Sequence, residues 1–168
     1  MKPKTRRIIV VLICIGFLMV GALTAKRDLI FNATPSKPLG FYRLKKKDVF
    51  EQGDLVMFSV PAGIEELVRT RNYIPPKGHL MKNIIGGAGD TYCIHDQKFY
   101  VGDKLIGPIF ATDSKNRPLP QHAAGCHKVP PEYMLIGIAE IERSFDSRYF
   151  GPVPTNTILG IAEPLWTW

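Results

Sequence analysis

The 168-residue sequence contains no internal repeat, no low-complexity tract and only three cysteines. Hydrophobic residues make up 45% of the chain and charged residues 22%, a composition that excludes an intrinsically disordered protein. A net charge of +7 would suit nucleic acid, but zinc-finger, helix-turn-helix and aromatic RNA-binding patterns are all missing. We therefore expect no nucleic-acid partner, and the length fits one compact domain.

Only one long uncharged run is present, and its eighteen residues extend from position 8 to position 25. This is the lower limit for a helix that spans a bilayer. Basic residues lie on both sides of the run, with more of them before it. The bias predicts a cytoplasmic N-terminus (1–7), a transmembrane anchor (8–25) and an exported body (26–168) on the periplasmic or exterior side of the cytoplasmic membrane. A cleaved signal peptide is the alternative, because small residues stand near the end of the run.

Cysteine is scarce, and one of the three residues, Cys14, lies inside the uncharged run. Cys93 and Cys126 fall in the exported part, where an oxidising compartment permits a disulfide between them. His95 and His127 stand close to them in the sequence, but the spacing matches no familiar zinc pattern. We predict a disulfide here, with no metal and no cofactor.

Short β-branched and aromatic segments dominate the exported part, with turn residues between them. They are residues 54–60, 80–85, 91–95, 98–101, 133–138 and 157–162. Residues 64–71 predict a short helix with Ile64, Leu67 and Val68 on one face. The proline-rich residues 107–131 predict a long surface excursion. The fold class is therefore mainly β, as an irregular antiparallel domain.

Nothing in the sequence matches a histidine-based serine triad or a G-x-S-x-G elbow. Ser36 instead lies in T-P-S-K-P-L-G, between two prolines that favour a stiff, extended backbone. It is a candidate nucleophile, which needs a base to activate it. The alternative is a proline-rich membrane stalk that carries an incidental serine.

Lys82 is the candidate base, because its neighbours in L-M-K-N-I-I-G-G-A-G-D are mostly aliphatic. On a strand it would share one face with Leu80 and Ile84. Burial beside aliphatic carbon disfavours the charged amine and so favours a lysine able to accept a proton. A lysine that reaches from an apolar strand to solvent is the competing interpretation.

Taken in order, S-K-P, G-D-L-V-M-F, M-K-N-I-I-G-G-A-G-D and F-D-S-R-Y-F-G-P-V resemble the signal peptidase I family of Ser–Lys proteases. N-A-T-P-S-K-P-L-G-F-Y resembles its TraF-like branch, which processes conjugative pilins. The resemblance implies a signal-peptidase-type β domain with Ser36 as nucleophile and Lys82 as general base. It also implies an oxyanion hole formed by the Ser36 N–H and the Thr34 hydroxyl. Asp146 would be catalytic or supporting and Arg148 supporting, although the two also suit a structural ion pair.

The same resemblance implies a serine endopeptidase that acts on a pilin or another exported precursor. Its partners would be cytoplasmic-membrane lipid and the conjugative pilus (type IV secretion) machinery, and the pilin's own N-terminal amine would close a ring. Lys37 and Leu39 stand where general signal peptidases usually carry methionine and threonine. A general type I signal peptidase and a non-catalytic pilus or secretion subunit remain as alternatives. Trp166 and Trp168 would form either an interfacial anchor or a buried terminal strand.

Overall fold

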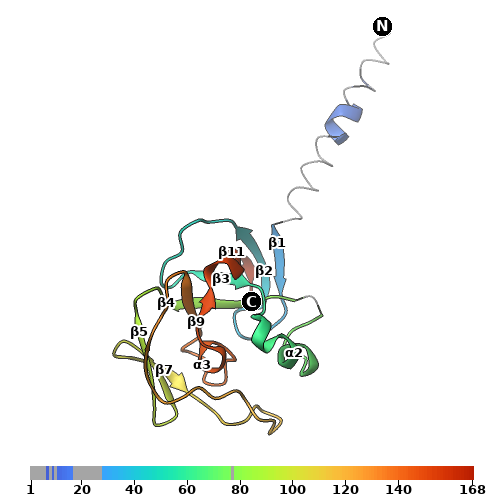
Figure 1. Ribbon diagram of the computed structural model, residues 1–168. Coiled ribbons are helices and arrows are strands. Elements are labelled where there is room, and N and C mark those ends of the chain that lie inside the picture. Colours follow the sequence, from blue (N-terminus) through green and yellow to red (C-terminus); the bar gives the residue numbers. More distant parts are fainter. Residues whose placement is uncertain (1–6, 8, 10, 17–27, 77) are drawn as a thin grey trace.

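The computed structural model describes residues 7, 9, 11–16, 28–76 and 78–168, and Figure 1 shows how their strands and helices are arranged. The anchor predicted at 8–25 lies largely outside these residues, as does most of the predicted cytoplasmic segment 1–7. Within the described ranges, no helix has both the length and the apolar character needed to cross a membrane. The anchor and the three-part division of the chain therefore stay predictions.

Two antiparallel sheets build the domain, which confirms the mainly β class. The larger sheet has seven strands in the order β1-β2-β11-β3-β4-β9-β10, and the smaller has four in the order β7-β6-β5-β8. The first sheet contains β1 (Leu29–Asn32), β2 (Gly40–Lys45), β3 (Leu55–Phe58), β4 (Leu80–Gly86), β9 (Tyr133–Gly137), β10 (Val153–Pro154) and β11 (Ile158–Thr167). The second contains β5 (Thr91–His95), β6 (Lys98–Val101), β7 (Lys104–Pro108) and β8 (Gly125–Lys128), and the helices are α2 (Ala62–Thr70), α3 (Ser147–Phe150) and η1 (Thr155–Thr157).

Helix α2 covers one part of the larger sheet. Ile64 and Val68 are buried on it and pack with Val56 and Phe58 of β3, while Leu67 is partly buried against the same cluster. The spacing of these apolar residues is that of one helix face, so the helix predicted from the sequence is confirmed. A second buried cluster includes Leu135 of the larger sheet and residues of the smaller one, and so joins the two sheets.

The segment 107–131 is more structured than its proline content suggests. It begins at the end of β7 and contains the whole of β8, which pairs with β5. Cys93 and Cys126 are direct partners in this pairing and are joined by a disulfide with an S–S distance of 2.08 Å. The prediction of this disulfide is confirmed. The prediction of a surface excursion holds for Gly125–Lys128, which are exposed, although the sequence does not predict the strand they form, because pairing with a distant strand leaves no local signal. The prediction is wrong for Ile109 and Val129, which are buried.

Candidate active site

Ser36 lies in a turn between β1 and β2, and the extended backbone predicted for it is wrong. The buried side chain of Asn32 explains the turn. Its amide nitrogen donates to the carbonyl oxygens of Thr34, Lys37 and Pro38 at 3.0, 3.0 and 3.1 Å. These bonds gather the carbonyls of the loop around one side chain, so Asn32 adds its own restraint to that of the two prolines.

The end of the same loop is fixed against the C-terminal strand. The Trp168 N–H donates to the Leu39 carbonyl at 3.0 Å, and the Tyr42 hydroxyl donates to the Pro38 carbonyl at 2.7 Å. Gly40 has φ of +137°, and a Cβ there would lie 2.2 Å from the Trp166 carbonyl oxygen. Only glycine fits this position, because any side chain would collide with the backbone of β11.

Two hydroxyl groups meet inside the loop. Thr34 Oγ1 and Ser36 Oγ are 3.2 Å apart, and Thr34 Oγ1 also donates to Asn32 Oδ1 at 2.8 Å. A hydroxyl has one proton to donate. With that proton directed to Asn32, Thr34 accepts from Ser36, and it becomes an oxyanion donor only after its hydroxyl rotates.

Lys82 occupies the middle of β4, where it pairs with Val56 of β3 and is only 5% exposed. The expected burial is therefore confirmed, and the amine does not reach solvent. Burial lowers the pKa of Lys82 to about 8; nearby Asp146 raises it, while Arg148 and Lys37 lower it further. An amine with this pKa is neutral in a useful fraction of molecules near neutral pH and can accept a proton.

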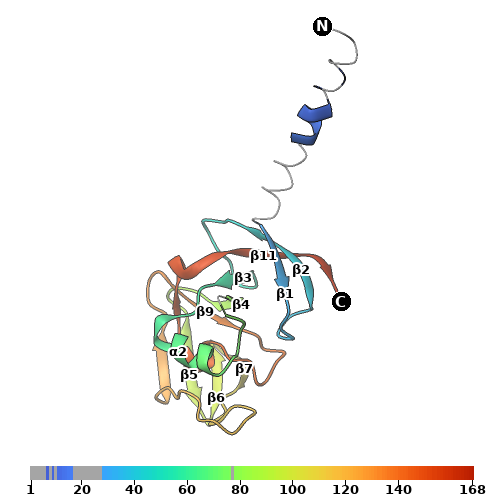
Figure 2. The same cartoon turned by 90° about the vertical axis from the view of Figure 1, so that its right-hand side faces the viewer.

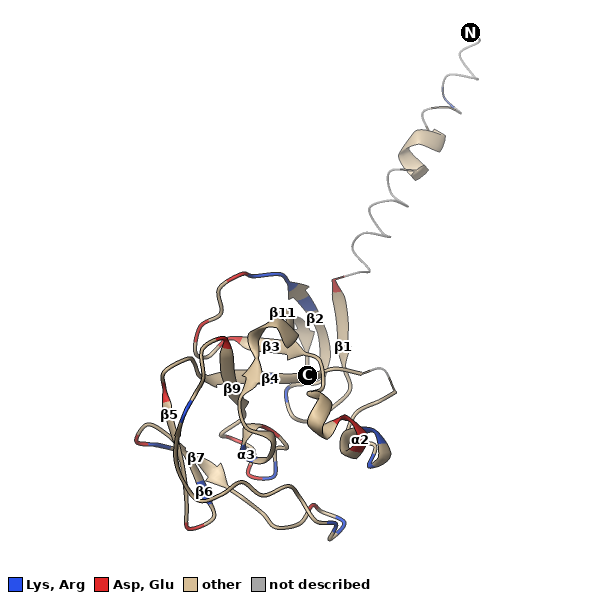
Figure 3. Cartoon of the chain, in the orientation of Figure 1, with Lys and Arg blue, Asp and Glu red and all other residues tan. Residues whose placement is uncertain are grey.

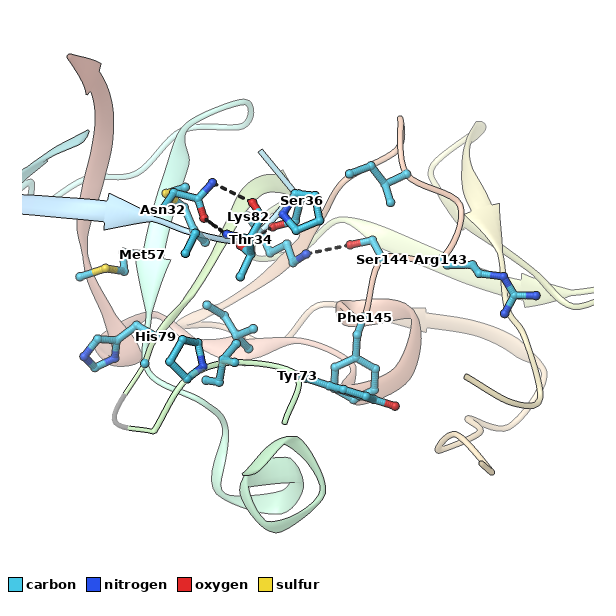
Figure 4. Close-up of a pocket in the computed structure, with 18 of the residues that line it drawn as sticks. Asn32, Thr34, Ser36, Met57, Tyr73, His79, Lys82, Arg143, Ser144 and Phe145 are labelled. Atoms are coloured by element: carbon cyan, nitrogen blue, oxygen red, sulfur yellow. Dashed lines mark hydrogen bonds between the residues drawn. The ribbon is translucent and has the colours of Figure 1, made fainter. Parts of the chain in front are cut away.

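Ser144 is the one described side chain that hydrogen-bonds the buried amine: Lys82 Nζ donates to Ser144 Oγ at 3.0 Å (Figure 4). Ser144 is itself buried, with 4% exposure. Sequence reasoning missed this residue, although it stands only two positions before the quoted D-S-R motif. The bond fixes the direction of the flexible Lys82 side chain. Because the amine is the donor in this bond, the lone pair of the neutral nitrogen stays free to accept a proton from another group.

Ser36, Lys82 and Ser144 line one cavity of about 720 Å³, together with Thr34. In Figure 4 these side chains gather on the same side of it. Much of the remaining wall is apolar and includes Ile30, Met57, Ile74, Leu80 and Phe145. No hydrogen bond joins Ser36 to Lys82 in the part of the chain that is described. The described residues also include no group of three or more metal-ligating side chains placed to hold an ion.

Comparison with known proteins shows which family the chain belongs to. A family model described as signal peptidase, peptidase S26, matches residues 4–168. The chain belongs to the S26 signal peptidase family. These peptidases are serine proteases, so a cavity that presents a serine beside a buried lysine is chemically consistent with the family.

Three relatives illustrate the range of this family. Plasmid transfer protein TraF of Escherichia coli is 31% identical over 146 residues, covering 82% of each chain. Conjugal transfer protein TraF of Agrobacterium fabrum is 32% identical over 166 residues, covering 93% of this chain and 90% of the relative. Signal peptidase I V of Bacillus subtilis is 33% identical over 92 residues, covering 49% of this chain and 54% of the relative.

Asp146 and Arg148 form a buried ion pair in this S26 peptidase, and neither lines the cavity. Arg148 Nε donates to Asp146 Oδ1 at 2.8 Å and Arg148 Nη2 to Asp146 Oδ2 at 2.9 Å. The guanidinium also donates to the carbonyl oxygens of Ile138, Ile141 and Glu142. These contacts hold the loop that leads to Ser144. They match the structural ion pair that the sequence analysis gave as the alternative, and a catalytic or supporting role for Asp146 stays a prediction.

Proposed function

We propose that this S26 peptidase is a membrane-anchored serine endopeptidase with Ser36 as its nucleophile and Lys82 as its general base. The observation that carries the proposal is the burial of Lys82 at the wall of the Ser36 cavity, which lowers the pKa of its amine to about 8. Desolvation of this kind is one of the ways in which a lysine becomes a base at physiological pH.

Acylation begins when the neutral amine of Lys82 takes the proton of Ser36 as Oγ attacks the scissile carbonyl carbon. The negative charge on the carbonyl oxygen is stabilised by the Ser36 N–H and by the rotated Thr34 hydroxyl. The C–N bond then breaks, and the Lys82 ammonium returns the proton to the leaving amine. Ser144 keeps the amine in line throughout these transfers.

Deacylation uses the same groups in reverse. Water, or a second amine, attacks the ester carbon while Lys82 accepts its proton, and Ser36 leaves with that proton restored. Attack by water gives a free carboxylate. Attack by the substrate's own N-terminal amine gives a ring that has lost one water molecule relative to the hydrolysed product.

A pilin precursor of a conjugative transfer system is the proposed substrate. Support comes from the relatives named for plasmid and conjugal transfer, each of which matches most of this chain. Lys37 and Leu39, which differ from the residues usual in general signal peptidases, point the same way. The Bacillus relative favours general signal peptidase activity as the second candidate.

The proposed location is the cytoplasmic membrane, with residues 8–25 as anchor and residues 26–168 outside the cytoplasm. Support comes from the uncharged run and its basic flanks. The Cys93–Cys126 disulfide is a second argument, because disulfides persist in exported proteins and are rare in the cytosol. The substrate would then meet Ser36 on the outer side of the membrane.

Coexpression tests this function. The full chain is produced with a conjugative pilin precursor in one strain and with a secreted protein that carries an ordinary signal peptide in another, and intact masses of the products are measured. We expect a shortened pilin, and a further loss of one water if the ring closes. The Ser36→Ala variant should leave the pilin uncut. Cleavage of the secreted protein alone would favour the general signal peptidase, and cleavage of neither would favour the non-catalytic subunit.

A further inference from the structure

A second, smaller hollow opens where the two sheets meet. Its volume is about 290 Å³, and it is called here the polar hollow. Strands β4 and β9 of the larger sheet contribute to its wall, and so does β7 of the smaller sheet. Figure 2 shows the larger sheet with the smaller one below it. The polar side chains of the lining are Lys37, Gln52, Asn83, Lys104 and Glu140.

The polar hollow lies directly beyond the proposed nucleophile and base. The cavity described above is lined by residues 29–36 of the nucleophile loop and 80–82 of β4. The polar hollow is lined by the next residue of that loop, Lys37, and by the next residues of β4, 83–85. No described residue lines both. A peptide whose scissile bond lies at Ser36 can therefore extend into the cavity on one side and into the polar hollow on the other.

The chemistry of the two hollows assigns one side of the substrate to each. The cavity is the larger, and its apolar wall suits the segment that stays bound to Ser36 as the acyl group. After acylation the other segment must leave, and water or an amine must enter in its place. A small hollow with a polar wall suits that exchange. The polar hollow is therefore placed to receive the leaving segment.

Lysines dominate the charge of the polar hollow. Lys37 comes from the nucleophile loop and Lys104 from β7, and neither forms an ion pair within the described part of the chain. Glu140 is the one acidic side chain among the described lining residues, so two positive charges face one negative charge. Figure 3 shows that charged residues gather in loops and near strand ends, where both lysines lie. The excess of positive charge favours a carboxylate as ligand.

Hydrogen bonds hold one wall of the polar hollow in place. Asn83 Nδ2 donates to the Gly53 carbonyl oxygen at 2.8 Å. Gln52 Nε2 donates to the Ile85 carbonyl oxygen at 3.1 Å. The two bonds join the turn before β3 to β4, so this wall is formed before a ligand arrives. Binding then does not have to order it, which favours affinity.

We propose that the polar hollow binds a carboxylate of the segment released during cleavage, with Lys37 and Lys104 as its cationic partners. The carboxylate belongs either to an acidic side chain of that segment or, where the segment is only a few residues long, to its C-terminus. A volume of about 290 Å³ is at the lower end for a ligand pocket and suits a short piece of peptide. The inference rests on the peptidase function proposed above and adds the charge that the substrate carries on its leaving side.

Four short peptides that span the processing site of a conjugative pilin precursor test this assignment. They share one acyl segment, and the leaving segment contains either glutamate or glutamine and ends in either a carboxylate or an amide. We measure kcat/KM with the full-length protein in detergent. The carboxylate that occupies the hollow should raise kcat/KM about fivefold, through KM rather than kcat, because it lies away from the reacting atoms. The gain should shrink at high salt.

Charge variants separate the polar hollow from the rest of the basic surface. The readout is the ratio of kcat/KM between carboxylate and neutral peptides within one variant, so a general change in activity does not affect it. Lys104→Glu should reverse the ratio. Lys98→Gln removes an exposed lysine of β6 that does not line the hollow, and it should keep the wild-type ratio. A wild-type ratio of one, or the same change of ratio in both variants, would overturn the inference.

Binding without catalysis keeps this test separate from the proposed function. The same four peptides, with a dye on the acyl segment, are titrated into the Ser36→Ala variant, and Kd is measured by fluorescence anisotropy. Tighter binding of the carboxylate peptides with no cleavage by the wild type would refute the peptidase function and leave the carboxylate site intact. Cleavage of all four peptides at one rate, with one Kd, would refute the carboxylate site and leave the peptidase function intact.

Discussion

Lys82 Nζ donates to Ser144 Oγ at 3.0 Å, and this bond links the middle of strand β4 to the loop before α3. The loop is in turn held by Arg148, whose guanidinium binds three of its carbonyl oxygens. A lysine side chain has many rotamers, and burial alone does not choose among them. The direction of the proposed base therefore depends on residues about sixty positions away in the sequence.

Replacement of Ser144 by alanine should misdirect the base. A positioned general base contributes about 10²–10⁴-fold to the rate, and partial loss of its alignment should lower kcat/KM about tenfold to hundredfold. The loss should fall mainly on kcat, because Ser144 acts on Lys82 rather than on the substrate. The measurement is steady-state cleavage of a short peptide. Ser144→Thr keeps the hydroxyl and should recover much of the rate, whereas equal losses in both variants would contradict the assignment.

The pH dependence of cleavage should follow the amine of Lys82. Its pKa of about 8 means that kcat/KM is low in acid, rises through pH 8 and levels off above it, because only the neutral amine accepts a proton. At pH 7 about one molecule in ten carries the neutral form. A profile that stays flat between pH 6 and about 9 would show that another group takes the proton.

Stability should change in the same pH range. The folded pKa of Lys82 lies near 8 against a reference of 10.5, so the unfolded chain binds the proton more tightly between these values. Buried charge then destabilises the fold by up to about 3 kcal/mol below pH 8, and this cost fades as the pH rises toward 10.5. The Lys82→Met variant, which we expect to be inactive, should be more stable than the wild type, and by the largest margin below pH 8. The measurement is the Tm of both proteins at a series of pH values. A difference in Tm that stays constant from below pH 8 to pH 10.5 would contradict the expectation.

The Asp146–Arg148 pair should matter for stability more than for chemistry. Asp146→Asn leaves a wholly buried guanidinium without its counter-charge, which costs about 3–5 kcal/mol. Thermal unfolding should show a large drop in Tm, while the folded protein at low temperature keeps its acylation rate above about pH 8, where the Lys82 amine is neutral with or without the Asp146 charge. Glu163→Gln breaks the exposed pair with Lys45 and serves as control, with an expected change of about 1 kcal/mol or less. A normal Tm with lost acylation would make Asp146 catalytic instead.

Strong local signals explain what the sequence predicts correctly. Apolar residues precede and follow Lys82 in the sequence, and a strand of such residues is expected in the interior of a sheet. Strand β4 lies between β3 and β9, and Lys82 is buried with it. The helix over Ala62–Thr70 follows from the spacing of Ile64, Leu67 and Val68. The pairing of Cys93 with Cys126 follows from the presence of two cysteines in one domain that is predicted to be exported.

Contacts between distant segments explain what the sequence does not predict. Ser144 carries no local sign that it meets Lys82, because its loop is placed by Arg148. The turn at Ser36 depends on the side chain of Asn32, whose bonds are invisible in the sequence. Trp166 faces outward because the register of β11 shifts between Pro164 and Trp166. Each of these features is fixed by tertiary structure rather than by local preference.

The rate at which Ser36 is acylated tests the central claim most directly. The full-length protein in detergent is treated with a serine-acylating probe across the pH range, and the adduct is located by peptide mass spectrometry. The account predicts one adduct on Ser36, formed at a rate that rises through pH 8. It predicts no adduct in Ser36→Ala and almost none in Lys82→Arg, because a guanidinium stays protonated throughout this range. An adduct on another serine, or wild-type acylation in Lys82→Arg, would contradict it.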